Sequence, residues 1–421
     1  MSDRAFDSTH APGDANRRLA VLFGVVFVDM LGFGILLPLI PFYGVRLGLS
    51  AEWLTLVISL HALFQFIGAP ILGRLSDRHG RRPILLFSMA GHAFAYALLA
   101  FADSVVLLAA SRILSGFTSG NLSAAYAYAS DLSRPGERTA TLARISAAFA
   151  LGLTFGPLLG ALLTGRVDPA LANLHAPALA AGVLSLVSCL SILGFLPESP
   201  RLAMRRLGGD EALRHDQTSG DDARRRAETH EQPAFVRLAL ALSVLVIVFS
   251  AVRETLFALW MHDKHGFDTF TIGVVIAVHG LMVAAVQLLG AGRLAAGIGE
   301  RRLVSVGIAA YACSWLGLGL SSGLVTVILA MTFSALATAV FATSLQSLLT
   351  QAVGDAARGG VLGALQSSSA LARFIGAAIS GTLYAAFGFD APFFIGALAM
   401  LPALLVGRSL RRQLALAGVA R

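Results

Sequence analysis

Long apolar runs make up most of this chain, and short polar stretches separate them. A helix that crosses a bilayer needs about 20 mostly apolar residues. The pattern therefore predicts an all-α membrane protein with twelve transmembrane helices, at 18–44, 53–73, 83–102, 104–131, 138–164, 174–196, 235–261, 268–292, 302–320, 323–352, 359–386 and 390–408.

Composition agrees with a membrane protein and excludes a soluble globular domain. The mean hydropathy is +0.75 and charged residues make up 13% of the 421 positions, against about 25% in soluble domains. The net charge of +8 does not indicate nucleic-acid binding, because the arginines gather in alternate loops. The intervening loops hold only Arg46, Arg166 and the single lysine, Lys264. By the positive-inside rule, both termini are expected in the cytoplasm, with a bacterial inner membrane as the location.

A polar stretch between Pro197 and Pro233 divides the chain into two halves. Gly73-Arg74-Leu75, with Gly80 and Arg82, is echoed at a constant offset by Gly292-Arg293-Leu294, Gly299 and Arg301. Two related halves are typical of secondary transporters. The predicted domains are a cytoplasmic tail (1–17), a six-helix bundle (18–196), a cytoplasmic linker (197–234), a second six-helix bundle (235–408) and a second tail (409–421).

Asp29 lies eleven residues into the first predicted helix, about 16 Å deep and so near mid-bilayer. A carboxylate at that depth is costly unless it faces a cavity, pairs or takes a proton. We interpret Asp29 as a proton-coupling site, with a structural ion-pair or hydrogen-bond anchor as the alternative. Arg112 lies about 12 Å deep from the opposite side, so the two can pair and tie proton release to the state of a cavity. Alternatively, Arg112 snorkels or binds backbone carbonyls.

A polar stripe follows Arg112 along the predicted helix 104–131, at Ser115, Ser119, Ser123 and Tyr126. These spacings correspond to one helical face, which predicts the wall of a water-lined cavity, although hydroxyl residues also serve helix packing. The further substrate-cavity candidates are Phe33, His61, Gln65, Ser250 and Phe257.

Glu254 lies on the predicted helix 235–261 beside Arg253. It is a candidate second proton or cation site, and equally a gate residue or a group near water. His92 and His279 are single histidines within spans, for which structural hydrogen bonding is the favoured interpretation, although histidine can relay protons. No metal-ligand spacing, phosphate loop or nucleophile–base arrangement is present in the sequence, so no metal, cofactor or enzyme activity is expected.

The loop from Gly73 to Pro83 carries an ordered set of charges. Arg81 or Arg82 is expected to pair with an acid on another helix, with Asp131 as the candidate, and Asp77 to accept hydrogen bonds at a helix end. Such contacts would lock one conformation and break when the halves move. The alternative is a solvated cluster that only sets topology. The predicted switch residues are Gly73, Asp77, Arg78, Gly80, Arg81, Arg82 and Asp131.

Gly152, Gly156 and Gly160 recur every four residues on the predicted helix 138–164, with Pro157 beside them. Small residues on one face allow close helix packing, and proline bends the helix.

Four of these stretches carry a resemblance to the major facilitator superfamily, and within it to the twelve-span drug:proton antiporters. They are the Gly73–Pro83 loop, VDMLGFGILLPLIP (28–41), SRILSGFTSG (111–120) and the glycines with Pro157. The last pattern resembles that of exporters. The nearest subgroup is the tetracycline efflux transporters, but alignment places Ala95 where that subgroup has an acid and Val283 where it has a histidine.

The resemblance implies proton-coupled export of a small amphipathic or hydrophobic compound by alternating access, as in drug efflux. The expected partners are that compound, protons and the lipid bilayer, with the proton gradient as energy source and a monomer as the working form. Two alternatives stay open: an exporter of a specific metabolite, sugar or siderophore, and a transporter-like membrane sensor without flux.

Overall fold

The computed structural model describes residues 12–133, 138–168, 171–198, 233–353 and 358–416. Every regular element within these ranges is a helix, which confirms the all-α prediction. Most of the predicted linker and the outer parts of both tails lie outside the described residues.

The chain forms two compact units, and each is described by itself. The first unit consists of residues 1–39, 64–165 and 172–210, and the second of residues 40–63, 166–171 and 211–421. The predicted limits of the two six-helix bundles stay predictions.

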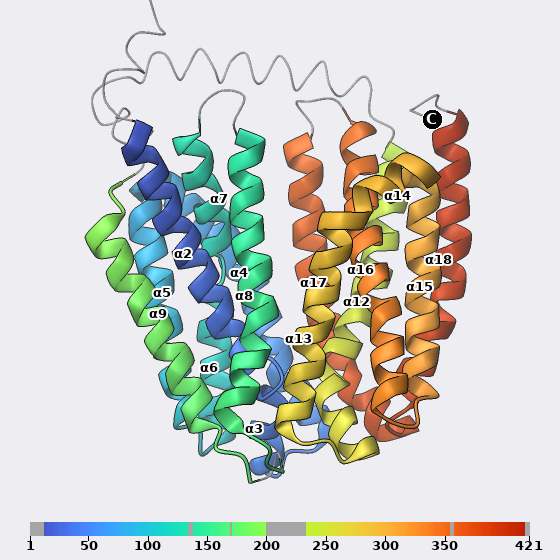
Figure 1. Ribbon diagram of the computed structural model, residues 1–421, viewed down its shortest axis with the longest axis horizontal. Coiled ribbons are helices and arrows are strands. Elements are labelled where there is room, and N and C mark those ends of the chain that lie inside the picture. The colour runs from blue at the N-terminus through green and yellow to red at the C-terminus, as the bar shows by residue number, and fades with distance from the viewer. Residues whose placement is uncertain (1–11, 134–137, 169–170, 199–232, 354–357, 417–421) are drawn as a thin grey trace, which may run out of the picture. The chain divides into compact units, whose positions relative to one another are not determined.

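In the first unit, α2 packs along α8 and α9, and α5 packs along α9 and α6 (Figure 1). The helices of this unit are α2 (Pro12–Leu36), α5 (Arg81–Ala100), α6 (Val105–Thr118), α7 (Asn121–Leu132), α8 (Arg138–Thr164) and α9 (His175–Phe195), with the second part of α4 (Ala51–His79).

In the second unit, α15 packs along α16 and α18, and α12 packs along α17. Its helices are α3 (Ile40–Arg46), the first part of α4, α12 (Pro233–His265), α13 (Thr269–Ala285), the π-helix η1 (Val286–Gly290), α14 (Ala291–Ile298), α15 (Glu300–Gly319), α16 (Leu324–Gln351), α17 (Arg358–Phe387) and α18 (Ala391–Leu416).

Membrane-spanning character agrees with the twelve predicted segments. Among the described residues, ten helices are long and apolar enough to cross a membrane, and the apolar helices 269–285 and 391–407 are shorter. The first of these two is short because the π-helix Val286–Gly290 interrupts the predicted helix 268–292. A π-bulge shifts the hydrogen-bond register of a helix and ends its regular α-helical run.

The internal echo of the sequence corresponds to matching helix starts. Gly80 precedes α5 with φ of 116°, and Gly299 precedes α15 with φ of 84°. Residues with a side chain rarely adopt these backbone angles, so glycine suits both positions. The repeat therefore marks the same turn in each unit.

The glycines of α8 pack against α2. A Cβ added at Gly156 would lie 2.5 Å from the Cα of Gly34, and one at Gly152 or Gly160 would meet backbone oxygens of Phe27 or Ile35. These contacts are to backbone, which side-chain motion cannot relieve. The close packing that the glycine pattern predicts is present.

Candidate functional site

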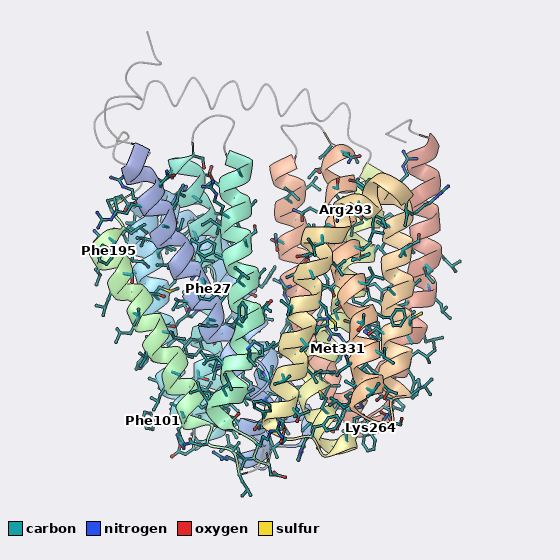
Figure 2. All side chains as sticks on the ribbon, viewed as in Figure 1. Phe27, Phe101, Phe195, Lys264, Arg293 and Met331 are labelled. Atoms are coloured by element: carbon teal, nitrogen blue, oxygen red, sulfur yellow. The ribbon has the colours of Figure 1, made fainter. Side chains whose placement is uncertain are left out.

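Asp29 lies on α2 and is 2% exposed. Phe27, two residues earlier on α2, lies between Phe195 and Phe101 in Figure 2, nearer to Phe195. The apolar residues around Asp29 favour a buried helix without any contribution from the acid. Packing of this helix therefore also buries the carboxylate.

The Asp29 carboxylate is held by two side chains from other helices. The Nδ1 atom of His92, on α5, lies 2.7 Å from Oδ1 of Asp29, and Nδ2 of Asn121, on α7, donates to Oδ2 at 3.0 Å. The other ring nitrogen of His92, Nε2, lies 3.2 Å from both the Ser115 carbonyl oxygen and the Ser119 hydroxyl. We call these five residues the Asp29–His92 cluster.

Ser119 and Asn121 of this cluster lie on either side of the turn between α6 and α7. The predicted span over 104–131 corresponds to the membrane-spanning segment Val105–Leu132, within which Ser119 and Gly120 form this turn. A Cβ on Gly120 would lie 2.9 Å from the Cα of Ala69, so α4 packs closely at this point. Discontinuous transmembrane helices commonly form transport sites.

Arg112 is fully buried on α6, and its Nε donates to the Ser111 hydroxyl at 3.4 Å. Arg112 and Asp29 both lie within electrostatic reach of Tyr96, whose ring stacks on His92 at a centroid distance of 5.8 Å. The side chains of His92 and Asn121 form hydrogen bonds with the Asp29 carboxylate. Pairing of Asp29 with Arg112 stays a prediction.

The predicted polar stripe divides at the helix break. Ser115 and Ser119 belong to the Asp29–His92 cluster. The Ser123 hydroxyl donates to the Gly120 carbonyl, and the Tyr126 hydroxyl lies 2.9 Å from that of Ser146 on α8. Phe33, His61 and Gln65 are half-buried. The role of these residues in a substrate cavity stays a prediction.

The sequence favoured structural hydrogen bonding for His92, which its contacts with Asp29, Ser115 and Ser119 confirm. His92 precedes Ala95 by about one helical turn on the same face, and the resemblance to tetracycline efflux transporters had marked Ala95 as a missing acid. The sequence did not select Asn121, whose amide donates to Asp29 from the first residue of α7.

The Gly73–Pro83 stretch is not the loop that the sequence predicted but the end of α4 and the start of α5 joined at Gly80, and Arg81 contacts two acids there. Its guanidinium lies 2.6 Å from Oδ1 of Asp77 and 3.6 Å from Oδ2 of Asp131, the predicted partner. Arg82 donates to the Leu193 carbonyl at 2.8 Å, whereas Arg78 is exposed. A conformational role for this stretch stays a prediction.

Glu198 is a further member of this region that the sequence did not reveal. Its Oε1 accepts hydrogen bonds from the backbone N–H groups of Arg81 at 2.8 Å and Arg82 at 3.3 Å. These are the first N–H groups of α5, which have no partner within the helix. Gly80 leaves room for this carboxylate, because a Cβ there would collide with Glu198.

The second unit holds a buried cation on α12. Arg253 is 6% exposed, and its guanidinium lies 3.6 Å from Oε1 of the neighbouring Glu254 and 3.8 Å from Sδ of Met331. In Figure 2, Met331 lies between Arg293 and Lys264 along the length of this unit, which places Arg253 at depth. The side chain of Glu254 is 52% exposed.

Aromatic residues surround the buried arginine. Arg253 packs around a narrow crevice with Phe249, Val252, Trp315, Pro392 and Phe393, and this crevice has no space for a water molecule. Phe257 is buried and stacks on Trp260, and Ser250 is half-buried. No group of three or more His, Cys, Asp or Glu that could hold a metal ion occurs in the part of the chain that the structure describes.

Comparison with known proteins decides the family. The model of the Major Facilitator Superfamily matches residues 22–291 and 238–415. The chain belongs to the major facilitator superfamily. This is a family of transporters, so the protein is a multi-pass membrane transporter and not an enzyme, as the sequence predicted.

The curated relatives include drug-resistance and vertebrate proteins. The chain is 29% identical over 385 residues to the class E tetracycline resistance protein of Escherichia coli, covering 88% of this chain and 89% of that protein. It is also 29% identical over 437 residues to major facilitator superfamily domain-containing protein 10 of Mus musculus, covering 94% and 93%.

Solved structures show the same fold. The crystal structure of the human organic anion transporter MFSD10 (TETRAN) matches with 26% identity and a TM-score of 0.64, covering 94% of this chain and 100% of that one. The nucleoside transporter NupG matches with 13% identity and a TM-score of 0.72 over 93% and 98% of the two chains, which shows the fold alone.

Proposed function

We propose that this transporter exports small amphipathic or hydrophobic compounds in exchange for protons, by alternating access, with Asp29 as the coupling site. The observation that carries the proposal is the buried carboxylate of Asp29 in the first unit, bound by a histidine that can itself hold a proton. Intramembrane acids are rare and mark proton or ion pathways. The similarity to tetracycline resistance proteins supports export.

In the proposed cycle, protonation from outside favours substrate release and return of the empty carrier, and deprotonation toward the cytoplasm favours substrate uptake. The proton gradient supplies the energy. We place the protein in a bacterial inner membrane as a monomer with both termini in the cytoplasm, following the arginine-rich loops.

Organic anions are a second candidate substrate class, and Arg253 is the observation that favours them. Its charge is buried, its Nε has no hydrogen-bond partner among the described residues, and its acidic neighbour Glu254 is half-exposed at 3.6 Å. A buried charge is costly unless it is paired and hydrogen-bonded. A carboxylate on a substrate would complete that pairing. The human structural relative is an organic anion transporter.

The test is flux in proteoliposomes with an imposed pH gradient, for tetracyclines, lipophilic cations, phenols and aromatic carboxylates. We expect Asp29→Asn to lower gradient-driven flux at least tenfold, the effect of about 1.4 kcal/mol. The matched control is Asp103→Asn, in the loop between α5 and α6, which should keep wild-type flux. Flux that is equally gradient-dependent in Asp29→Asn excludes Asp29 as the coupling site and directs attention to Glu254.

Arg253→Gln separates the substrate classes in the same assay. Loss of aromatic carboxylate transport with retained cation transport supports the anion site, and equal loss of both contradicts it. If no compound moves in wild-type protein, a narrow metabolite, sugar or siderophore exporter or a membrane sensor becomes the better interpretation.

A further inference from the structure

The hydrogen-bond roles of His92 follow from its neighbours. Its Nε2 lies 3.2 Å from the Ser115 carbonyl oxygen, which can only accept. The Ser119 hydroxyl at the same distance donates its own hydrogen to that carbonyl at 2.7 Å, so toward His92 it also acts as an acceptor. On these two contacts we assign the hydrogen of the neutral ring to Nε2, and this assignment leaves Nδ1 to determine the charge of the ring.

Nδ1 faces an oxygen of Asp29 at 2.7 Å, and a hydrogen must lie between these two atoms. It is held either as an imidazolium beside a carboxylate or as a neutral imidazole beside a carboxylic acid. Both arrangements contain the same atoms and one shared proton. The other carboxylate oxygen, Oδ2, accepts from the Asn121 amide in either case.

Loss of that proton makes the contact unfavourable. The Nδ1–H or Oδ1–H bond breaks, the proton passes to water, and two lone pairs remain facing each other at the former hydrogen-bond distance. A change of tautomer would restore this contact only by placing a lone pair of Nε2 against the Ser115 carbonyl oxygen and by turning the Ser119 hydroxyl away from that carbonyl. Either outcome leaves an unmatched buried polar contact, which is unfavourable.

We propose that Asp29 and His92 form one proton carrier, which binds a single proton between Oδ1 and Nδ1, and that release of this proton separates α2 from α5 at this contact. His92 is thus a second coupling residue, in the helix from which the acid at Ala95 is missing. This inference rests on the proposed role of Asp29 but not on the identity of the substrate.

Two other ionisable groups lie close enough to influence the pair. Tyr96 stacks on the His92 ring from the same helix, and the buried Arg112 of α6 acts on Tyr96 together with Asp29.

The test counts protons without any substrate. Purified protein in nanodiscs is stepped through pH 5 to 9, proton uptake is followed with a pH dye, and carboxyl infrared bands are recorded. We expect Asp29→Asn, His92→Asn and the double variant each to take up one proton fewer than wild-type protein. Loss of two protons in the double variant, or an unchanged carboxyl band in His92→Asn, overturns the proposal.

Two further measurements guard against misfolding and against confusion with the transport proposal. Nuclear magnetic resonance of wild-type protein labelled with ¹⁵N-histidine should show a His92 signal, identified by its absence from His92→Asn. At low pH this signal should indicate hydrogens at both ring nitrogens or a strongly hydrogen-bonded Nδ1. A free Nδ1 at every pH contradicts the shared proton. His279→Asn is the matched control, because that ring contacts the neutral Ser334 hydroxyl at 3.2 Å, and it should keep the Asp29-dependent proton. Shared titration without any flux leaves this inference standing and overturns only export, whereas proton-driven flux unaltered in His92→Asn overturns the coupling role of His92 alone.

Discussion

At the scale of single residues, Glu198 performs a task that its position in the sequence conceals. It follows α9 by a few residues, yet its carboxylate binds the first two backbone N–H groups of α5. A negative charge at a helix N-terminus also interacts favourably with the helix dipole. Glu198 thus joins the end of one helix to the start of another.

We expect Glu198→Ala to lower the free energy of unfolding by about 1 kcal/mol, the usual effect of losing a helix cap. Thermal unfolding of purified protein in detergent measures this change. Glu198→Gln is the control, because its amide oxygen still accepts and only the charge is lost, so it should fall between wild type and Glu198→Ala. Equal melting temperatures for all three would show that the cap contributes nothing.

At the scale of helices, contact between α2 and α8 depends on glycine. The backbones approach closely at Gly34 and Gly156, and α2 also carries Asp29. The packing that holds these helices together therefore also sets the position of the buried acid.

We expect Gly156→Ala to destabilise the protein by about 1–3 kcal/mol, because the added methyl would push against the α2 backbone. Gly24→Ala is the matched control on α2, where a Cβ meets nothing within 4 Å, and alanine there should be neutral or stabilising by up to about 1 kcal/mol. Melting temperatures of the two variants measure the difference. Similar values for both would contradict close packing as the function of the α8 glycines.

At the scale of the whole molecule, the asymmetric distribution of arginine predicts how the chain crosses the membrane. A fluorescent protein fused after Arg421 should fold in the cytoplasm and fluoresce. Alkaline phosphatase inserted at Asp103, in a loop with few basic residues, should be active in the periplasm. The reverse result at either position would contradict the predicted topology, independently of any transport assay.

The sequence by itself determined the class of protein, the number of spans and the position of Asp29 within the first membrane-spanning helix. These follow from hydropathy and from the spacing of arginines and glycines, which are local properties. The lipid environment makes them decisive, because a backbone in hydrocarbon must satisfy its own hydrogen bonds and therefore forms helices. The Gly80 and Gly299 turns were also visible as a repeat.

Only the tertiary structure decided what surrounds Asp29. Geometric depth alone suggested Arg112 as the partner, whereas packing placed His92 and Asn121 at hydrogen-bond distance. Both come from other helices, more than 60 residues away in the chain. Their approach depends on how α2, α5 and α7 pack. Contacts between helices set the direction of these side chains, and hydropathy and spacing along one helix do not encode those contacts.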